Sequence, residues 1–297
     1  MTTPSLIQSL VAQGVVLTDG AWGTQLQARG LAIGEIPDLW NLTHPEKVSE
    51  VARAYVDAGS QIVLTNTFGA NRFRLAESGF ADKVWEINET GARLSREVVG
   101  KRAFVFASIG PSGKMLMSGE VDVEGLRAAF VEQAQALVAG GAQALVVETM
   151  SDIEEAKIAV AAARTTGLPV VASMVFDTGK DKDRTMMGTT PEQAATALVE
   201  AGADVIGANC GQGIMGFVKI CARLKSVASG KPVWIKANAG LPKVVAGKAV
   251  YEQTPKQFAD IVPILVAAGA NFIGGCCGTN PEFIRAIRTT LDSSLPS

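Results

Sequence analysis

The sequence predicts a closed barrel of eight parallel strands alternating with helices, the (β/α)8 or TIM barrel. Short apolar runs rich in β-branched residues alternate with longer amphipathic segments along the whole chain, which is the pattern of strands separated by helices. Eight such units fit a (β/α)8 barrel, and no Pro/Ser-rich linker or block of charge divides the 297 residues. We therefore expect one domain over residues 1–297. An open, doubly wound sheet would show the same alternation, but no G-x-G-x-x-G motif follows the first strand.

Local signals mark where the elements begin and end. The eight predicted strands are 15–18, 61–65, 104–108, 144–147, 170–174, 205–208, 233–236 and 272–275. Four helices run into similar glycine-containing endings, DAGS at 57–60, AGGA at 139–142, AGAD at 201–204 and AGAN at 268–271. Glycine suits the left-handed turn that closes a helix, and a strand follows each ending at once. Proline is expected in the first turn of four helices, at Pro45, Pro191, Pro255 and Pro281.

Composition predicts a soluble protein that acts on small molecules or on another protein. The 27 basic and 29 acidic residues are spread along the chain and leave a net charge of -2, which gives no electrostatic reason to expect nucleic acid or an anionic membrane as partner. The N-terminal stretch lacks the basic region of a signal peptide, and no run of about 20 apolar residues follows. We therefore expect a cytoplasmic protein.

The residues that end the predicted strands are unusually polar. In a (β/α)8 barrel the carboxyl ends of the strands meet at one mouth, where the active site lies. The chemically useful residues at these ends are Asp19, Gly20, Asn66, Thr67, Glu148, Thr149, Asn209, Cys210, Asn238, Cys276 and Cys277. The sequence therefore predicts a functional site at the mouth of the barrel.

Three of the four cysteines belong to this set and predict a metal site. Cys210 stands in GANCGQG and the pair Cys276 and Cys277 in GGCCGT, where the glycines allow the sharp turns that would bring neighbouring thiolates to one ion. Catalytic zinc sites keep three protein ligands and an open fourth position. Buried cysteines without a metal, or a disulfide between Cys276 and Cys277, remain alternatives. Cys221 lies within a predicted helix and is expected to be a core residue.

Several of these segments also resemble the homocysteine-binding methyltransferase family. The family includes the homocysteine domain of cobalamin-dependent methionine synthase and betaine–homocysteine methyltransferase. The matching segments are DGAWGTQL at 19–26, NTFGAN at 66–71, IGPSG at 109–113, VVETM at 146–150, GANCG at 207–211, NAGLP at 238–242 and GGCCGT at 274–279. NTFGAN and NAGLP are closer to the cobalamin-linked branch than to the branches that use betaine or S-methylmethionine.

The resemblance implies that Cys210, Cys276 and Cys277 hold a zinc ion and that the thiol of homocysteine takes the open position. A free thiol with a pKa of about 8.5 is mostly protonated at neutral pH, whereas a zinc-bound thiol is deprotonated. Asn238 is expected to lend its amide oxygen to zinc when substrate is absent, although asparagine after a strand is also typical of a turn.

The ammonium group of homocysteine requires a carboxylate, and by motif match Asp19 and Glu148 fit that role. Glu148 is the stronger candidate because it ends a buried strand, where an unpaired charge would be costly. An Asp-Gly step such as Asp19-Gly20 is also typical of a turn. The other positions expected to contact the substrate are Gly20, Thr67, Ser108 and Asn209.

The methyl donor is expected to come from outside the chain. The D-x-H-x-x-G motif of cobalamin-binding domains is absent, so we expect a methyl-corrinoid carried by another protein, with S-methylmethionine or betaine as alternatives. Two other functions stay open. Lys236 ends a strand, as the Schiff-base lysine of an aldolase does, and a non-catalytic carrier of zinc or thiols would use the same cysteines. The single histidine, His44, offers little for nucleophilic catalysis.

Overall fold

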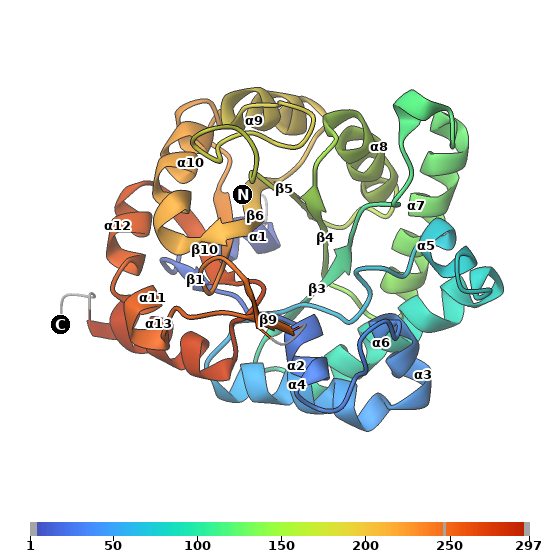
Figure 1. Ribbon diagram of the computed structural model, residues 1–297, viewed down its shortest axis with the longest axis horizontal. Coiled ribbons are helices and arrows are strands. Elements are labelled where there is room, and N and C mark those ends of the chain that lie inside the picture. The colour runs from blue at the N-terminus through green and yellow to red at the C-terminus, as the bar shows by residue number, and fades with distance from the viewer. Residues whose placement is uncertain (1–4, 246–247, 294–297) are drawn as a thin grey trace.

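Eight parallel strands form the inner ring of the molecule, as the alternation in the sequence predicts (Figure 1). The computed structural model describes residues 5–245 and 248–293. The ring contains β1 (Val16–Leu17), β2 (Ile62–Val63), β3 (Phe104–Ile109), β4 (Ala144–Met150), β5 (Val170–Met174), β6 (Val205–Gly213), β7 (Val233–Asn238) and β10 (Ala270–Gly275). The strand order is β1-β10-β7-β6-β5-β4-β3-β2, and a parallel bridge between Thr18 and Ile62 joins the two ends. The predicted TIM barrel is therefore confirmed.

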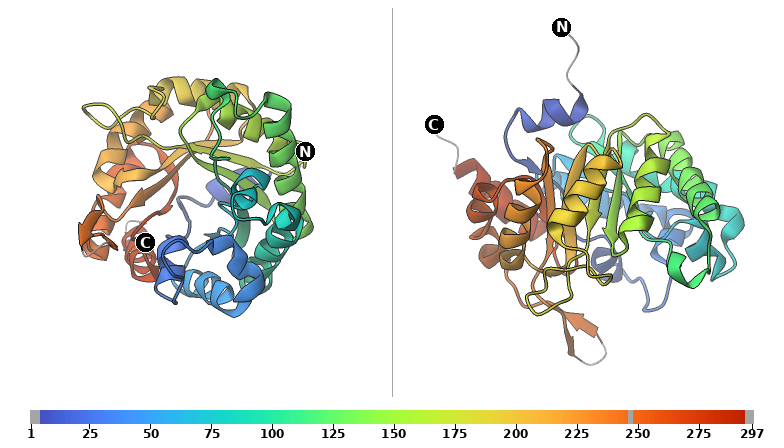
Figure 2. Two further views of the ribbon diagram at one scale, coloured as in Figure 1. Left: turned by 45° about the vertical axis from the view of Figure 1, so that its right-hand side comes forward. Right: turned by 90° about the horizontal axis from the view of Figure 1, so that it is seen from above.

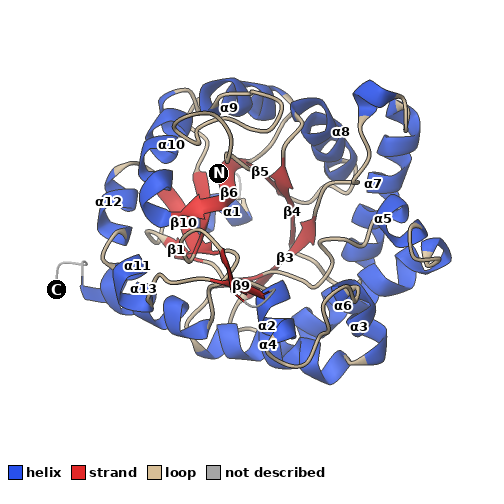
Figure 3. Ribbon diagram, viewed as in Figure 1, coloured by secondary structure: helices blue, strands red, loops and turns tan. Residues whose placement is uncertain are grey.

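Helices surround the strands on the outside of the ring (Figure 3). They are α2 (Gly23–Gln27), α3 (Trp40–Thr43), α4 (Pro45–Asp57), α5 (Arg72–Ala76), α6 (Val84–Val99), α7 (Val123–Ala139), α8 (Ile153–Arg164), α9 (Pro191–Glu200), α10 (Ile214–Ser226), α11 (Pro255–Ala259), α12 (Val262–Ala267) and α13 (Pro281–Ser293). The four predicted prolines begin α4, α9, α11 and α13. The four predicted endings each contain a glycine with positive φ, namely Gly59 (100°), Gly141 (93°), Gly202 (94°) and Gly269 (107°). This left-handed turn lets backbone N–H groups after the helix bond to its terminal carbonyls.

Apolar side chains fill the amino-terminal half of the barrel interior and form what we call the apolar plug. Side chains that point inward from the strands, among them Phe106, Trp234 and Phe272, form one buried cluster. Helix α1 (Leu6–Val11) covers the amino-terminal end of the barrel and adds Ile7 and Leu10 to the cluster. The Trp234 ring lies 6.3 Å from Phe106 and 5.5 Å from Phe272, centroid to centroid. Because this end is filled, a cavity within the barrel can open only at the opposite, carboxyl-terminal end.

The sequence did not predict the hairpin of β8 (Lys243–Val245) and β9 (Lys248–Val250). It projects from the carboxyl-terminal end of the barrel, opposite α1 (Figure 2). Its strands are three residues each and add no strand to the ring, so the eightfold pattern does not reveal them. Within residues 5–245 and 248–293, no helix combines the length and the apolar character needed to cross a membrane.

Candidate metal and substrate site

A cavity of about 580 Å³ opens at the carboxyl-terminal mouth of the barrel, where the polar strand ends predict a site. Its inner wall includes Ser108, Glu148 and Lys236, and three cysteines line one side. The outer wall is formed by Trp22, Phe68, Arg74 and neighbouring loop residues. The inner wall of the cavity therefore carries charged side chains, whereas its outer wall is partly apolar.

Three cysteine sulfurs meet in this cavity. The Sγ atoms of Cys210, Cys276 and Cys277 lie within 4.8 Å of one another, and the Sγ atoms of Cys210 and Cys277 are 3.9 Å apart. Two sulfurs bound at about 2.3 Å to one tetrahedral zinc ion would lie about 3.8 Å apart. All four cysteines are free thiols, so Cys276 and Cys277 do not form the alternative disulfide. The spacing and chemistry of the three sulfurs fit zinc.

The local backbone explains how the sulfurs converge. Cys210 adopts a left-handed conformation with φ 61°, at a break in the pairing of β6 with β7 between Asn209 and Gly213. Cys276 and Cys277 follow the end of β10, and their backbones bond to the end of β7: the Cys276 N–H donates to Ala237 O (2.7 Å), and the Cys277 carbonyl accepts from Ala239 N (3.0 Å). Two strand ends therefore deliver three thiols to one point.

The electrostatics of the cluster favour a thiolate. Hydrogen bonds from the thiols of Cys276 and Cys277 lower the pKa of Cys210 to about 3, while the contact with Cys210 is the largest of the effects that raise the pKa of Cys276. Asn238 also hydrogen-bonds the Cys210 thiolate. Its Oδ1 atom is buried and has no hydrogen-bond partner among the described residues, so a ligand oxygen is free beside the sulfurs.

Cys221 lies apart from this cluster, as the sequence predicts. It is fully buried in α10 and its Sγ faces the carbonyl of Ala268 at 3.6 Å. Burial raises the pKa of the Cys221 thiol to about 12. A thiol in such surroundings is a core residue and stays protonated.

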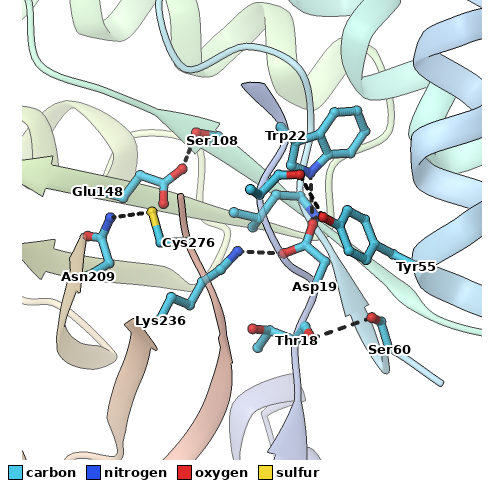
Figure 4. A network of polar contacts seen from close by, with 12 residues as sticks. Thr18, Asp19, Trp22, Tyr55, Ser60, Ser108, Glu148, Asn209, Lys236 and Cys276 are labelled. Carbon is cyan, nitrogen blue, oxygen red and sulfur yellow. Dashed lines mark hydrogen bonds and ion pairs between the residues drawn. The ribbon is translucent and has the colours of Figure 1, made fainter. Parts of the chain in front are cut away.

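Glu148 presents a carboxylate to the cavity from the end of β4. The side chain is 7% exposed, and its Oε1 accepts a 2.5 Å hydrogen bond from the Ser108 hydroxyl (Figure 4). Burial raises the pKa of Glu148, and the positive charge of Lys236 opposes that rise. The carboxylate is therefore fixed in direction while its charge lacks a direct cationic partner among the described residues.

Lys236 and Asp19 form a buried ion pair beside Glu148 (Figure 4). Lys236 Nζ lies 2.5 Å from Asp19 Oδ1, and the two side chains are 3% and 0% exposed. The other oxygen of Asp19 accepts from Trp22 Nε1 at 2.8 Å and from the backbone N–H of Leu64 at 2.7 Å. Burial alone would lower the pKa of Lys236, but Asp19 and Glu148 outweigh it and raise the pKa. A Schiff-base nucleophile requires a neutral amine, so these contacts argue against that alternative for Lys236.

The structure divides the predicted substrate residues into two groups. Gly20, Ser108 and Glu148 line the cavity. Asp19, Thr67 and Asn209 have no exposed surface, so their contacts do not support the prediction that they touch a substrate directly. Thr67, for example, donates through Oγ1 to the carbonyl of Ser108 at 2.7 Å and supports the wall from behind.

Sequence reasoning missed three residues of the outer wall of the cavity. Asp38 lies in a 3-10 helix (Pro37–Leu39) after β1, Phe68 in the loop after β2, and Arg74 in α5. Asp38 is 4% exposed and accepts from the backbone N–H of Gly69 at 3.0 Å, and burial raises its pKa to about 6. The NTFGAN segment contains Phe68 and Gly69, but no periodicity indicates that they border the same cavity as the cysteines.

Comparison with known proteins agrees with this geometry. The family model described as homocysteine S-methyltransferase matches residues 16–291. Methionine synthase from Mycobacterium tuberculosis is 32% identical over 297 residues, which cover 94% of this chain and 25% of that protein. Methionine synthase from Mycobacterium leprae is 32% identical over 301 residues, covering 95% of this chain and 24% of that protein. The chain thus spans about a quarter of the length of these relatives.

A solved structure gives the same result for the fold. The metallated form of the homocysteine methyltransferase MmuM from Escherichia coli superimposes with a TM-score of 0.78 at 25% sequence identity, over 95% of this chain and 99% of that one. Since the family model covers nearly the whole barrel, including all three clustered cysteines, the chain belongs to the homocysteine S-methyltransferase family.

Proposed function

We propose that this protein transfers a methyl group to the thiol of homocysteine, giving methionine, at a zinc site formed by Cys210, Cys276 and Cys277. The observation that carries the proposal is the meeting of three thiols within 4.8 Å at the mouth of the barrel. Zinc bound there would act as a Lewis acid that deprotonates and positions the homocysteine thiol. The Asn238 oxygen, which has no hydrogen-bond partner among the described residues, is the candidate for the fourth ligand before substrate binds.

Glu148 is the group that would bind the homocysteine ammonium. It faces the cavity and accepts a hydrogen bond from Ser108, which fixes the direction of the carboxylate. Asp19 neutralises Lys236 through their ion pair, so the negative charge of Glu148 is left for an incoming cation. Ser108 and Gly20 border the same space and would contact the amino-acid part of the substrate. In this arrangement Asp19 and Thr67 act by positioning the residues that line the cavity.

The methyl donor would be a methyl-corrinoid carried by another protein. The curated relatives are methionine synthases about four times as long as the matched segment, which is consistent with a donor bound outside this barrel. The cavity opens at the mouth of the barrel, so a donor can approach the sulfur from solvent at the near-contact distance that methyl transfer requires. A small donor such as S-methylmethionine or betaine is the second candidate, because the fold also matches a homocysteine methyltransferase of similar size.

The direct test is methionine formation by the zinc-loaded protein with L-homocysteine and single donors. The donors are methylcobalamin, a methylated corrinoid protein, S-methylmethionine, betaine and methyltetrahydrofolate. We expect methionine with the corrinoid donors and none in their absence. No methionine with any donor, from protein that binds zinc, would contradict the proposed activity.

A further inference from the structure

Asn209 is completely buried, and every hydrogen-bonding position of its side chain is used. Its Oδ1 accepts from the backbone N–H of Thr149 at 2.9 Å and from the Ser173 hydroxyl at 2.6 Å. Its Nδ2 donates to Thr149 Oγ1 at 2.6 Å. The same nitrogen faces Cys276 Sγ at 4.0 Å, the contact drawn in Figure 4. An asparagine amide has two acceptor and two donor positions. The three short bonds to Thr149 and Ser173 fix its orientation, and the second N–H faces the Cys276 sulfur at a longer, weaker distance.

Asn209 lies between two strained points of the backbone, because its amide bonds to Thr149 and it directly precedes Cys210 in the chain. Thr149 and Cys210 both have φ 61°, a left-handed conformation that a β-branched residue such as threonine rarely adopts. Each stands where a strand loses its regular register, in β4 after Val147 and in β6 after Asn209. Such conformations persist only where surrounding contacts hold them. At Thr149 the holding contacts are the two hydrogen bonds to the Asn209 amide.

The neighbours of these strained residues are the chemically important ones. Thr149 directly follows Glu148, so the bond from the Thr149 N–H to Asn209 holds the peptide group that joins Thr149 to the residue carrying the carboxylate. Asn209 directly precedes Cys210, and its remaining N–H is directed to the sulfur of Cys276. One buried amide therefore touches both the strand end that carries the carboxylate and the group of thiols.

We propose that Asn209 is a positioning residue that holds the Glu148 carboxylate and the metal-binding thiols in one fixed arrangement. This inference rests on the proposed function, which assigns Glu148 to the substrate and the cysteines to the metal. The N–H directed to Cys276 would withdraw charge from that sulfur, and the bonds to Thr149 would keep Glu148 aimed into the cavity. Residues that orient metal ligands and substrate groups typically change affinity by about 10–100-fold when they are removed.

The test replaces zinc by Co²⁺, whose spectrum reports on tetrahedral thiolate coordination. In Asn209→Ala we expect the sulfur-to-cobalt charge-transfer band to move to longer wavelength, because a thiolate that loses a hydrogen bond gives up its electron more easily. Titration of L-homocysteine, followed by the same spectrum, should give a dissociation constant about tenfold or more above that of the unchanged protein. If Asn209→Ala does not yield soluble protein, Asn209→Ser is used, since a shorter hydroxyl cannot reach both Thr149 and Cys276.

Asn88→Ala is the matched control. Asn88 is equally buried, donates to the carbonyls of Ala70 and Val84 at 2.7 Å each, and accepts from Gln133 at 3.2 Å. It does not line the cavity. We expect Asn88→Ala to lower the thermal midpoint while leaving the cobalt spectrum and homocysteine affinity unchanged.

The outcomes separate this inference from the proposed function. If Asn209→Ala lowers only the thermal midpoint, as Asn88→Ala does, the positioning role is overturned while the proposed function stands. If the unchanged protein itself fails to bind homocysteine, the proposed function is overturned instead. A shifted cobalt band together with weaker homocysteine binding in Asn209→Ala supports the inference.

Discussion

Replacing Glu148 by glutamine tests whether this residue binds the substrate ammonium. Glutamine keeps the size of the side chain and an oxygen that can accept from Ser108, which among the described residues is the one hydrogen-bond partner of the Glu148 carboxylate. The change therefore removes charge with little change in shape. A charge-assisted hydrogen bond contributes about 1.5–3 kcal/mol, and each 1.36 kcal/mol is tenfold in affinity. We expect the dissociation constant for homocysteine to rise about 10- to 150-fold.

The measurement is calorimetric titration of L-homocysteine into zinc-loaded protein, with zinc content determined beforehand. Glu155→Gln is the matched control: Glu155 is 5% exposed and accepts from the Ser112 backbone N–H at 2.7 Å, but it does not line the cavity. We expect the control to keep its homocysteine affinity. An unaltered affinity in Glu148→Gln, at unchanged zinc content, would refute the assignment.

Three further predictions concern the metal, the pH dependence of stability and the donor. Elemental analysis should give about one zinc per chain. Alanine at Cys210, Cys276 or Cys277 should abolish zinc binding, and an equal loss of zinc from Cys221→Ala would contradict the assigned site. Burial raises the Asp38 pKa from 3.8 to about 6, so the folded state is penalised as pH rises from about 4 to 6. Asp38→Asn should increase the free energy of unfolding at pH 7 by up to about 3 kcal/mol, and by much less at pH 4; equal effects in urea denaturation at both pH values would argue against this. Free methylcobalamin should methylate homocysteine slowly and a methylated corrinoid protein much faster; turnover with betaine or S-methylmethionine alone would overturn that donor.

The barrel could be predicted because its signals are local and repeated. Each strand has its own apolar run, and each of four helices has its own proline at the start. The three cysteines could be placed at one mouth because parallel strands end on the same side. The lengths of β1 and β2 were overestimated: both have two residues, against four and five predicted. Apolar runs indicate which residues are buried, whereas a strand is defined by hydrogen-bonded pairing with its neighbours. In β1 and β2 this pairing covers fewer residues than the apolar run does.

Side-chain partnerships were harder to predict because they join residues far apart in the chain. Asp19 carries a carboxylate in a motif, but only the fold shows that Lys236, which is 217 residues away, already occupies one of its oxygens. Asn209 looks like a substrate contact because it adjoins Cys210, and only its four hydrogen bonds reveal that the amide faces protein on every side. Nothing in the sequence marks Thr149 as left-handed, since that conformation normally favours glycine.

The same strands of this barrel carry residues of the apolar plug and, further along, residues that line the cavity. On β7 the buried Trp234 belongs to the apolar plug, and Lys236, two residues further on, lines the cavity. On β3 Phe106 and Ser108 are related in the same way. Because side chains alternate between the two faces of a strand, residues two apart point to the same interior. The apolar plug excludes water from the amino-terminal side of the ion pair between Lys236 and Asp19, and charges interact more strongly where water is excluded. The apolar amino-terminal half of the barrel therefore strengthens the charge interactions of the site at the carboxyl-terminal end.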